Sequence, residues 1–284
     1  MRDDRVLLPT RIVSIGIIPV LSAAFVILYL FPSRTEDLWA WTMAGTMAPM
    51  VMGGGYLSGA YFFYRAATVK QWHRVGIGFL GVTVFATLLG ITTLVHWDRF
   101  NHGHVSFWAW AFLYFVTPVL LPWLWYENRK TDPHTLEPGD RVVPKSLRVV
   151  IATFGALLLA FAAVMFFRPT AIIGHTPWPM TPLVCRSLSA YVAFPAVAYL
   201  WFAFEDRWSS FQILIEVALI GYVFIGIAGI RAWDEFSGSS TIVWAWRIGI
   251  LLGFGFLLAV RLVMARPPRA TERSASAGRP VPAA

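Results

Sequence analysis

One short segment of the chain concentrates side chains that could bind a transition metal. It holds three histidines and an aspartate in the spacing H-x-D-x-x-x-H-x-H. Imidazole nitrogens and carboxylate oxygens are common ligands of zinc and related metals. The spacing matches no established ligand pattern, and histidines exposed in a loop are the simpler explanation. No other cofactor is predicted, and the hypothesis of a metal site names as ligands His96, Asp98, His102 and His104.

Two arginines lie in segments that we expect to enter a membrane. Arg186 and Arg247 are each about five residues inside the expected outer boundary, or roughly 8 Å at 1.5 Å per residue. A guanidinium costs about 2.5 kcal/mol or more at the centre of a bilayer, so it needs a partner. Asp98 and Asp234 are the expected partners. Such pairs either hold the structure together or line an outward-facing polar crevice that binds a ligand.

These two aspartates occupy equivalent places in an internal repeat. Residues 97–110 and 233–246 share three Trp, one Asp, one Phe and one Ala at a constant offset. Self-similarity of this kind indicates a duplication. At the next equivalent pair, Arg99 and Glu235, the charges are opposite. This predicts an ion pair between the halves and favours the structural interpretation.

A third candidate is Glu216, an acid within an expected membrane segment. An intramembrane carboxyl group is a functional candidate, for instance in proton coupling. Arg261 lies at a comparable depth in the next segment, so a structural ion pair is an equal alternative.

Trp178 opens the sequence W-P-M-T-P-L that leads to Arg186. The full set of ligand-binding candidates is Asp98, Arg99, Trp178, Arg186, Glu216, Asp234 and Arg247.

Composition indicates that membrane helices position these residues. The chain has 284 residues, of which 57% are hydrophobic and 13% are charged, whereas soluble domains carry about 25% charged residues. Apolar runs of about 20 residues, enough to cross a bilayer, recur along the chain. We therefore predict an all-α integral membrane protein with eight transmembrane helices, at residues 12–31, 38–64, 75–95, 106–126, 148–167, 181–204, 211–230 and 241–264.

The formal net charge of +8 does not indicate a nucleic-acid partner. Lys and Arg lie in short loops between apolar segments, whereas a nucleic-acid interface gathers them on one face. Their excess in alternate loops predicts that both termini are cytoplasmic, in a protein of the plasma membrane. The expected partners are the lipid bilayer and a small-molecule or ion ligand. A single cysteine, Cys185, excludes an internal disulfide.

The expected helices divide into two repeats. Each half contains an even number of spans, so the halves have the same orientation and are related by a pseudo-two-fold axis along the membrane normal. We expect two parallel four-helix repeats, residues 1–126 and 148–264, joined by a cytoplasmic linker at 127–147. Residues 265–284 read as a disordered basic tail.

Four motifs of the chain form a recognisable set: Trp41-Thr42-Met43, Gly54-Gly55-Tyr56, His96-Trp97-Asp98-Arg99-Phe100 and Trp178-Pro179-Met180-Thr181-Pro182-Leu183 with Arg186. They resemble those of an uncharacterised family of bacterial multi-pass membrane proteins. That family has a pattern similar to an H-W-D-R-F loop and a W-P-W-x-L-T-P-L-T-A-R helix start. This chain differs by Met180 in place of a second Trp, and by Val184-Cys185 in place of Thr-Ala. The resemblance covers nearly all of residues 10–265 and implies the multi-pass fold without an activity.

Three functions remain open on the sequence. The chain has no G-x-S-x-G, H-E-x-x-H or P-loop motif, so common hydrolases and ATP-driven pumps lose support. The leading hypothesis is ligand binding or transport, because duplicated membrane bundles place substrates between their repeats. The alternatives are a membrane-embedded metal-dependent enzyme and a structural or assembly protein. The sequence favours a non-enzymatic role over an enzymatic one.

Overall fold

The computed structural model describes residues 2–237 and 239–265, and its regular elements in these ranges are helices. The predicted tail lies outside these ranges except for Ala265. The predicted all-α class is confirmed. Short helical turns cover Pro32–Arg34, Trp97–Arg99, Arg129–Thr131 and Trp233–Glu235. The α-helices are α1 (Leu8–Phe25, continued as a π-helix over Val26–Leu30), α2 (Thr35–Leu38), α3 (Met47–Thr68), α4 (His73–Val95), α5 (Val105–Asn128), α6 (Lys145–Phe167), α7 (Pro169–Ile173), α8 (Pro182–Trp201), α9 (Ser209–Arg231) and α10 (Ser240–Ala265).

Seven segments of the described chain are long and apolar enough to cross a membrane, against eight predicted spans. The predicted membrane class agrees with this finding. Helix α3 has 22 residues but is not among the seven. Most of its residues are buried, mainly against α1 and α9, so protein surrounds it and its sequence can include glycines and Arg65. The seven are Leu8–Leu30, His73–Val95, Val105–Thr131, Lys145–Phe167, Pro182–Trp201, Ser209–Arg231 and Thr241–Met264.

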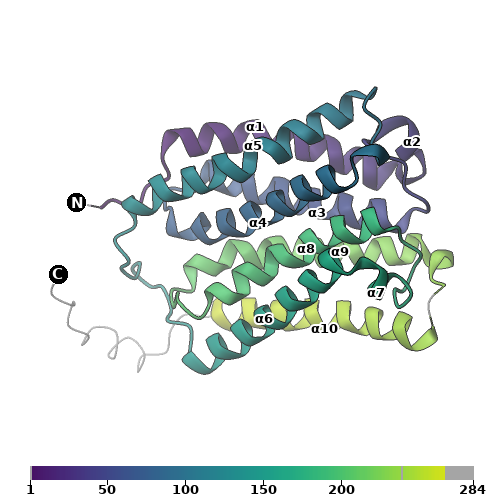
Figure 1. Ribbon diagram of the computed structural model, residues 1–284. Helices are drawn as coiled ribbons and strands as arrows, with labels where there is room; N and C mark the ends of the chain where they lie inside the picture. Colours follow the sequence, from purple (N-terminus) through teal and green to yellow (C-terminus); the bar gives the residue numbers. More distant parts are fainter. Residues whose placement is uncertain (1, 238, 266–284) are drawn as a thin grey trace.

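The long helices lie side by side in one bundle (Figure 1). Helices α3, α4, α8 and α9 are central, since α3 packs on α9 and α4 packs on both α8 and α9. Helices α1 and α5 pack outside the first half, and α6 and α10 outside the second. We call the end that holds residues 2–7, 129–144 and 202–208 the terminal end. The opposite end holds α2, α7 and the turns at Trp97–Arg99 and Trp233–Glu235.

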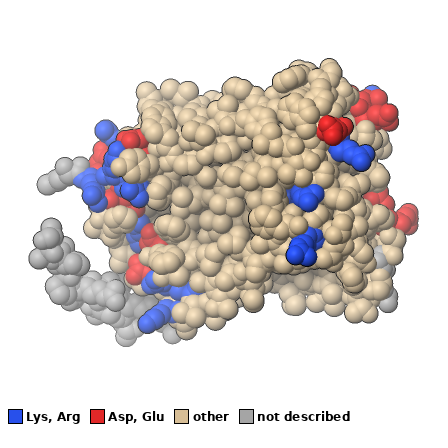
Figure 2. Space-filling view, viewed as in Figure 1, with Lys and Arg blue, Asp and Glu red and all other residues tan. Residues whose placement is uncertain are grey.

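The surface of the bundle fits a surrounding bilayer. Figure 2 shows charged side chains gathered mainly at the two ends of one face, with a largely uncharged band between them. Large apolar side chains on the outer helices are exposed, among them Phe112, Val119, Leu157 and Leu251. In lipid such side chains remain in an apolar environment, and the helices satisfy their own backbone hydrogen bonds.

Glycines allow the outer helices to approach the inner ones closely. A Cβ atom on Gly155 of α6 would lie 2.7 Å from the backbone nitrogen of Leu200 in α8. A Cβ atom on Gly90 of α4 would lie 2.7 Å from the carbonyl oxygen of Tyr114 in α5. Small residues at crossings let membrane helices make backbone contact. Each half therefore contains at least one crossing that only glycine fits without a shift of the backbone.

Candidate functional site

A cavity of about 580 Å³ lies between the two halves of the bundle. All eight long helices and the segment 172–180 contribute to its wall. Along α9 the lining residues extend from Leu214 to Ile225, or about 16 Å at 1.5 Å per residue. Its volume is within the range of roughly 300–1,000 Å³ that is usual for ligand pockets. We call it the central cavity.

The wall of the central cavity is apolar and aromatic, with a few hydroxyl groups. None of its lining residues is Asp, Glu, Lys or Arg. The hydroxyls of Tyr56 and Tyr114 bond to each other at 2.9 Å. The Tyr191 ring lies edge-on to Tyr56, and its buried hydroxyl has no hydrogen-bond partner among the described residues. The cavity can therefore take an apolar molecule and still offer it a hydrogen bond.

The central cavity reaches both the opposite end and the side of the bundle. At the opposite end it is lined by Trp178, which packs against Phe236 and Trp246 at centroid distances of 6.1 and 5.6 Å. At the side, Phe161 of α6 lines the cavity while 46% of its surface is exposed. Ile250 of α10 is also in the wall. Phe161 therefore lies where the wall of the cavity meets the side of the bundle.

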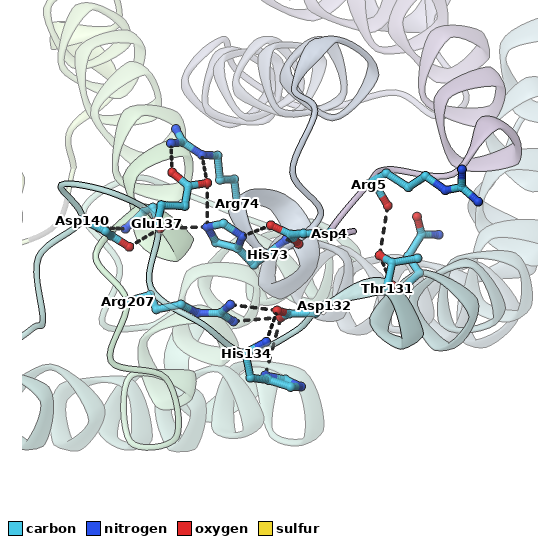
Figure 3. A network of polar contacts seen from close by, with 12 residues as sticks. Asp4, Arg5, His73, Arg74, Thr131, Asp132, His134, Glu137, Asp140 and Arg207 are labelled. Carbon is cyan, nitrogen blue, oxygen red and sulfur yellow. Dashed lines mark hydrogen bonds and ion pairs between the residues drawn. The ribbon is translucent and has the colours of Figure 1, made fainter. Parts of the chain in front are cut away.

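A second polar feature, shown in Figure 3, joins the halves at the terminal end. Its centre is Arg207, which is 3% exposed. The guanidinium donates to both oxygens of Asp132 at 2.8 Å and to Glu205 at 2.6 and 2.9 Å. Asp132 belongs to the linker, so the linker is bound into the structure. We call the whole group the polar junction: Asp4, His73, Arg74, Asp132, Glu137, Asp140, Glu205, Arg207 and Ser209.

Equivalent contacts begin the inner helices α4 and α9. Asp4 accepts a hydrogen bond from the backbone nitrogen of His73 at 3.1 Å and another from its ring nitrogen Nδ1. Asp140 accepts from the backbone nitrogen of Ser209 at 3.1 Å and from its hydroxyl at 2.5 Å. A carboxylate at a helix N-terminus satisfies free N–H groups and stabilises the helix dipole. The two first residues also meet, with His73 Nε2 at 2.9 Å from Ser209 Oγ.

Three acids of the polar junction, Asp132, Glu137 and Glu205, have lowered pKa values. Burial alone would raise the pKa of Asp132, but hydrogen bonds from Arg207 and from the backbone of His134 bring it below its usual value. Burial also raises the pKa of Glu205, but hydrogen bonds from Arg207 outweigh that effect and bring it below its usual value. For Glu137, Arg74 has the same effect on the pKa. These carboxylates are therefore held in the ionised form.

One group in the polar junction has distances that a metal site would allow. Ligand atoms of Asp4, His73 and Glu137 lie within 4.8 Å of one another. Both Asp4 oxygens already accept from His73, and both Glu137 oxygens accept from Arg74. A cation would have to displace these donors and lie beside a guanidinium. The donor set fits an ion-pair network better than a metal.

Arg186 and Arg247 have partners other than the aspartates predicted for them. Arg186 contacts Nε2 of His96 at 2.7 Å and donates to the carbonyl of Phe166 at 3.0 Å. Arg247 lies over the Trp233 ring, 3.5 Å from its centroid. Asp98 and Asp234, the predicted partners, are exposed and form no ion pair among the described residues. An imidazole and an aromatic face therefore take the places that we expected carboxylates to fill.

The predicted bridge between Arg99 and Glu235 is also replaced. Arg99 is exposed. Glu235 accepts from the backbone nitrogen and hydroxyl of Thr46, at 2.5 and 2.7 Å, and from the nitrogen of Met47 at 3.0 Å. It thus caps α3, a helix of the other half. The contact does join the halves, but the second half supplies a carboxylate to a helix start and not to a cation.

The histidines named as metal ligands have separate contacts. Nδ1 of His104 accepts from the backbone nitrogen of Ser106 and so caps α5. The ring of His102 lies 4.8 Å from that of Trp97. Burial lowers the pKa of His96, and the charges of Arg186 and Arg99 lower it further. With Asp98 exposed beside them, the four residues do not form a group of converging ligand atoms in the described structure.

Glu216 has three partners. Its carboxylate accepts from Arg65 at 2.5 Å, from Tyr61 at 2.7 Å and from Arg261 at 3.2 Å. The ion pair with Arg261 is the structural alternative that the sequence left open, and Arg65 was not anticipated. Glu216 of α9 is therefore linked to both α3 and α10.

Sequence reasoning missed the polar junction, although a signal for it exists. Asp4 and Asp140, and likewise Trp72 and Trp208, are separated by the same offset as the repeated Trp-Asp turns. Extending the repeat to the terminal end would have paired His73 with Ser209. Comparison of the chain with models of protein families, with curated proteins and with solved structures finds no match. The central cavity is therefore the main indication of function.

Proposed function

We propose that this multi-pass membrane protein binds an apolar or amphipathic molecule of lipid type in its central cavity. The observation that carries the proposal is a cavity of about 580 Å³ between the halves, with no acidic or basic residue other than His175 in its wall. Such a wall favours burial of apolar surface, at about 25 cal/mol per Å². The unpaired hydroxyl of Tyr191 can fix one polar group of the ligand.

This proposal replaces the polar crevice expected from the sequence. Of the seven candidate binding residues, only Trp178 lines the central cavity. A charged substrate or ion would need compensating charges or many polar ligands in that wall. A hydrocarbon chain needs neither. The route that we propose for it passes Phe161, where the wall of the cavity meets the side of the bundle.

The proposal includes eight spans arranged as two parallel repeats. Long helices on both sides flank α3 in the bundle (Figure 1), so we count it as the eighth span. Two observations support the duplication. The first is the matched capping of α4 and α9 by Asp4 and Asp140. The second is a pair of matched aromatic clusters, Trp41 with Phe100 and Trp110, and Trp178 with Phe236 and Trp246.

We further propose that the terminal end is cytoplasmic, in the plasma membrane. The first residues and the end of α10 share this end, because Arg141 of the linker donates to the carbonyl of Val263 at 2.8 Å and Arg2 donates to that of Asp132 at 3.4 Å. The basic residues of the linker and the N-terminus gather there. The positive-inside rule assigns such an end to the cytoplasm.

The test is to fill the central cavity and measure the lipid that the purified protein retains. Ala218 and Val82 line the cavity from α9 and α4, so Ala218→Trp and Val82→Phe reduce its volume. Val119 on α5 is 74% exposed, and Val119→Trp is the matched control. Native mass spectrometry of each protein in detergent gives the bound lipid per chain.

We expect both cavity variants to lose a lipid that the wild type and Val119→Trp retain, with all four eluting as folded species. Retention of the same lipid by both cavity variants would contradict the proposal. A protein that never retains an apolar molecule would also contradict it. That result would favour a structural role, for which the supporting observation is the pairing of charges in the polar junction.

A further inference from the structure

Two arginines from different helices hold the carboxylate of Glu216. One carboxylate oxygen accepts from Arg65 of α3 at 2.5 Å, and the other accepts from Arg261 of α10 at 3.2 Å. The side chains of these three residues are 20% to 26% exposed. The cluster therefore lies at the side of the bundle, where a molecule of the bilayer can reach it. None of the three residues lines the central cavity.

Both guanidinium groups retain donors that Glu216 does not use. Arg65 contacts Glu216 and Tyr61 through Nη1, and Arg261 contacts Glu216 through Nη2. An arginine side chain carries five N–H donors. The other nitrogens of these two side chains have no hydrogen-bond partner within residues 2–237 and 239–265. The cluster thus presents several charge-assisted donors toward its exposed side.

The formal charge of the cluster matches a monoanion. Two guanidinium groups and one carboxylate leave a net charge of +1. A positive charge at the edge of a bilayer is costly unless a partner neutralises it. A phosphodiester carries a single negative charge and oxygens that match the geometry of a guanidinium. Binding one such group would neutralise the cluster.

Both arginines lie close to the ends of their helices at the terminal end of the bundle. Arg65 is about 4.5 Å from the end of α3 at Thr68, and Arg261 is about 6 Å from Ala265, at 1.5 Å per residue. The interfacial layer on each side of a bilayer is about 5–8 Å thick. Side chains on a helix point toward its N-terminus, which for α3 and α10 is the opposite end. The guanidinium groups therefore lie near the boundary between headgroups and hydrocarbon.

We propose that Arg65 and Arg261 bind the phosphate of an anionic phospholipid from the leaflet at the terminal end. Glu216 occupies only some of the donors of the two guanidinium groups, and the phosphate binds to the others. Basic pockets between membrane helices are known sites for anionic headgroups. The site is separate from the central cavity and does not depend on the function proposed for it.

The test measures the affinity of a short-chain phosphatidylglycerol for the detergent-purified full chain by native mass spectrometry. Phosphatidylcholine is the zwitterionic comparison, and inorganic phosphate is added as a competitor. Arg261→Gln removes one guanidinium while Glu216 keeps Arg65. Lys130→Gln is the control, since Lys130 is a paired, 52% exposed cation of the described terminal end. Glu216→Gln removes the competing carboxylate and keeps both arginines.

We expect Arg261→Gln to lower the affinity for phosphatidylglycerol about tenfold, the effect of one charge-assisted hydrogen bond. Lys130→Gln should leave that affinity unchanged. Glu216→Gln should bind the lipid more tightly than the wild type, which a purely architectural ion pair would not cause. This second variant keeps the test decisive if Arg261→Gln does not fold.

Three outcomes would overturn the proposal. Equal affinity of the Arg261→Gln and Lys130→Gln proteins for phosphatidylglycerol would show that Arg261 does not bind the lipid. Equal binding of phosphatidylcholine would show that net charge plays no part. Displacement of the lipid by millimolar inorganic phosphate would identify a free-anion site and not a lipid headgroup site.

Discussion

The ring of His73 and the hydroxyl of Ser209 meet at 2.9 Å, and each residue is the first of an inner helix. His73 begins α4 in the first half and Ser209 begins α9 in the second. Each is also held by an aspartate, Asp4 or Asp140. The hydrogen bond between them therefore links two helix starts that are already fixed, and it ties the halves together at the terminal end.

Arg207→Met should destabilise the protein strongly. The substitution leaves Asp132 and Glu205 buried without their cation, and removal of one partner from a buried ion pair costs about 3–5 kcal/mol. Chemical unfolding in detergent measures the loss. Lys130→Met, at an exposed ion pair of the same end, should change stability by less than about 0.5 kcal/mol. Equal effects of the two substitutions would contradict a special role for the polar junction.

Stability should fall in acid because of the same junction. The pKa values of Asp132, Glu137 and Glu205 are lowered in the folded protein, so the unfolded chain binds more protons in acid. Their contribution is fully present above the usual carboxyl pKa values of about 4, and it is lost as the pH falls through the lowered ones. Thermal unfolding between pH 7 and pH 3 tests this, and the decline should be smaller in Arg207→Met.

Glycine positions in the outer helices should differ sharply in their tolerance of alanine. At Gly155 the new Cβ would meet the backbone of Leu200 at 2.7 Å, so Gly155→Ala should cost about 1–3 kcal/mol, as overpacking does. At Gly249 no atom lies within 4 Å of the new Cβ. Gly249→Ala should therefore be neutral, or stabilising by up to about 1 kcal/mol through helix propensity. The melting temperatures of the two variants should move in opposite directions or differ by several degrees.

Adjacent acids in the Trp233–Glu235 turn should have unequal importance. Glu235 caps α3 through Thr46 and Met47, so Glu235→Ala should cost about 0.5–2 kcal/mol, the usual range for loss of a cap. Asp234 is exposed, and Asp234→Ala should have little effect. Unfolding curves of both variants provide the comparison. A larger effect at Asp234 would show that the turn has another partner.

His96 should titrate below the ordinary histidine value. Burial lowers its pKa, and Arg186 and Arg99 add to the effect. Arg186→Gln removes one of the two charges and should raise the pKa toward about 6.5. Titration of the imidazole resonances by NMR, with Arg34→Gln as a variant at an exposed arginine of the opposite end, measures the shift. An unchanged pKa in Arg186→Gln would contradict the contact.

Composition and hydropathy were sufficient to predict the membrane class, because an apolar run of about 20 residues has few alternatives to a spanning helix. They misplaced the second span. It was predicted at 38–64, whereas α3 begins at Met47. Trp39 and Trp41 add to the apolar run in the sequence, but both are buried in protein, outside a long helix. Burial in protein and burial in lipid give the same sequence signal.

The candidate site was less predictable, because it depends on which helices are neighbours. Sequence spacing could not show that α8 packs on α4, which places Arg186 beside His96. It also could not show that an aromatic face would hold Arg247. The central cavity is a property of packing between several helices, and no periodicity reports it. The repeat could have predicted the polar junction, but only if its offset had been extended to Asp4 and Asp140.

The bond between Asp132 and Arg207 also sets an order for synthesis. The two residues are 75 positions apart, so a ribosome adding about 5–20 residues per second makes the arginine about 4–15 s after the aspartate. During that interval Asp132 lacks the guanidinium that pairs with it, and α9 and α10 are not yet available for packing. The linker therefore cannot form this ion pair until Arg207, just before α9, has been synthesised. A truncated chain that ends before Arg207 would never form the ion pair at Asp132.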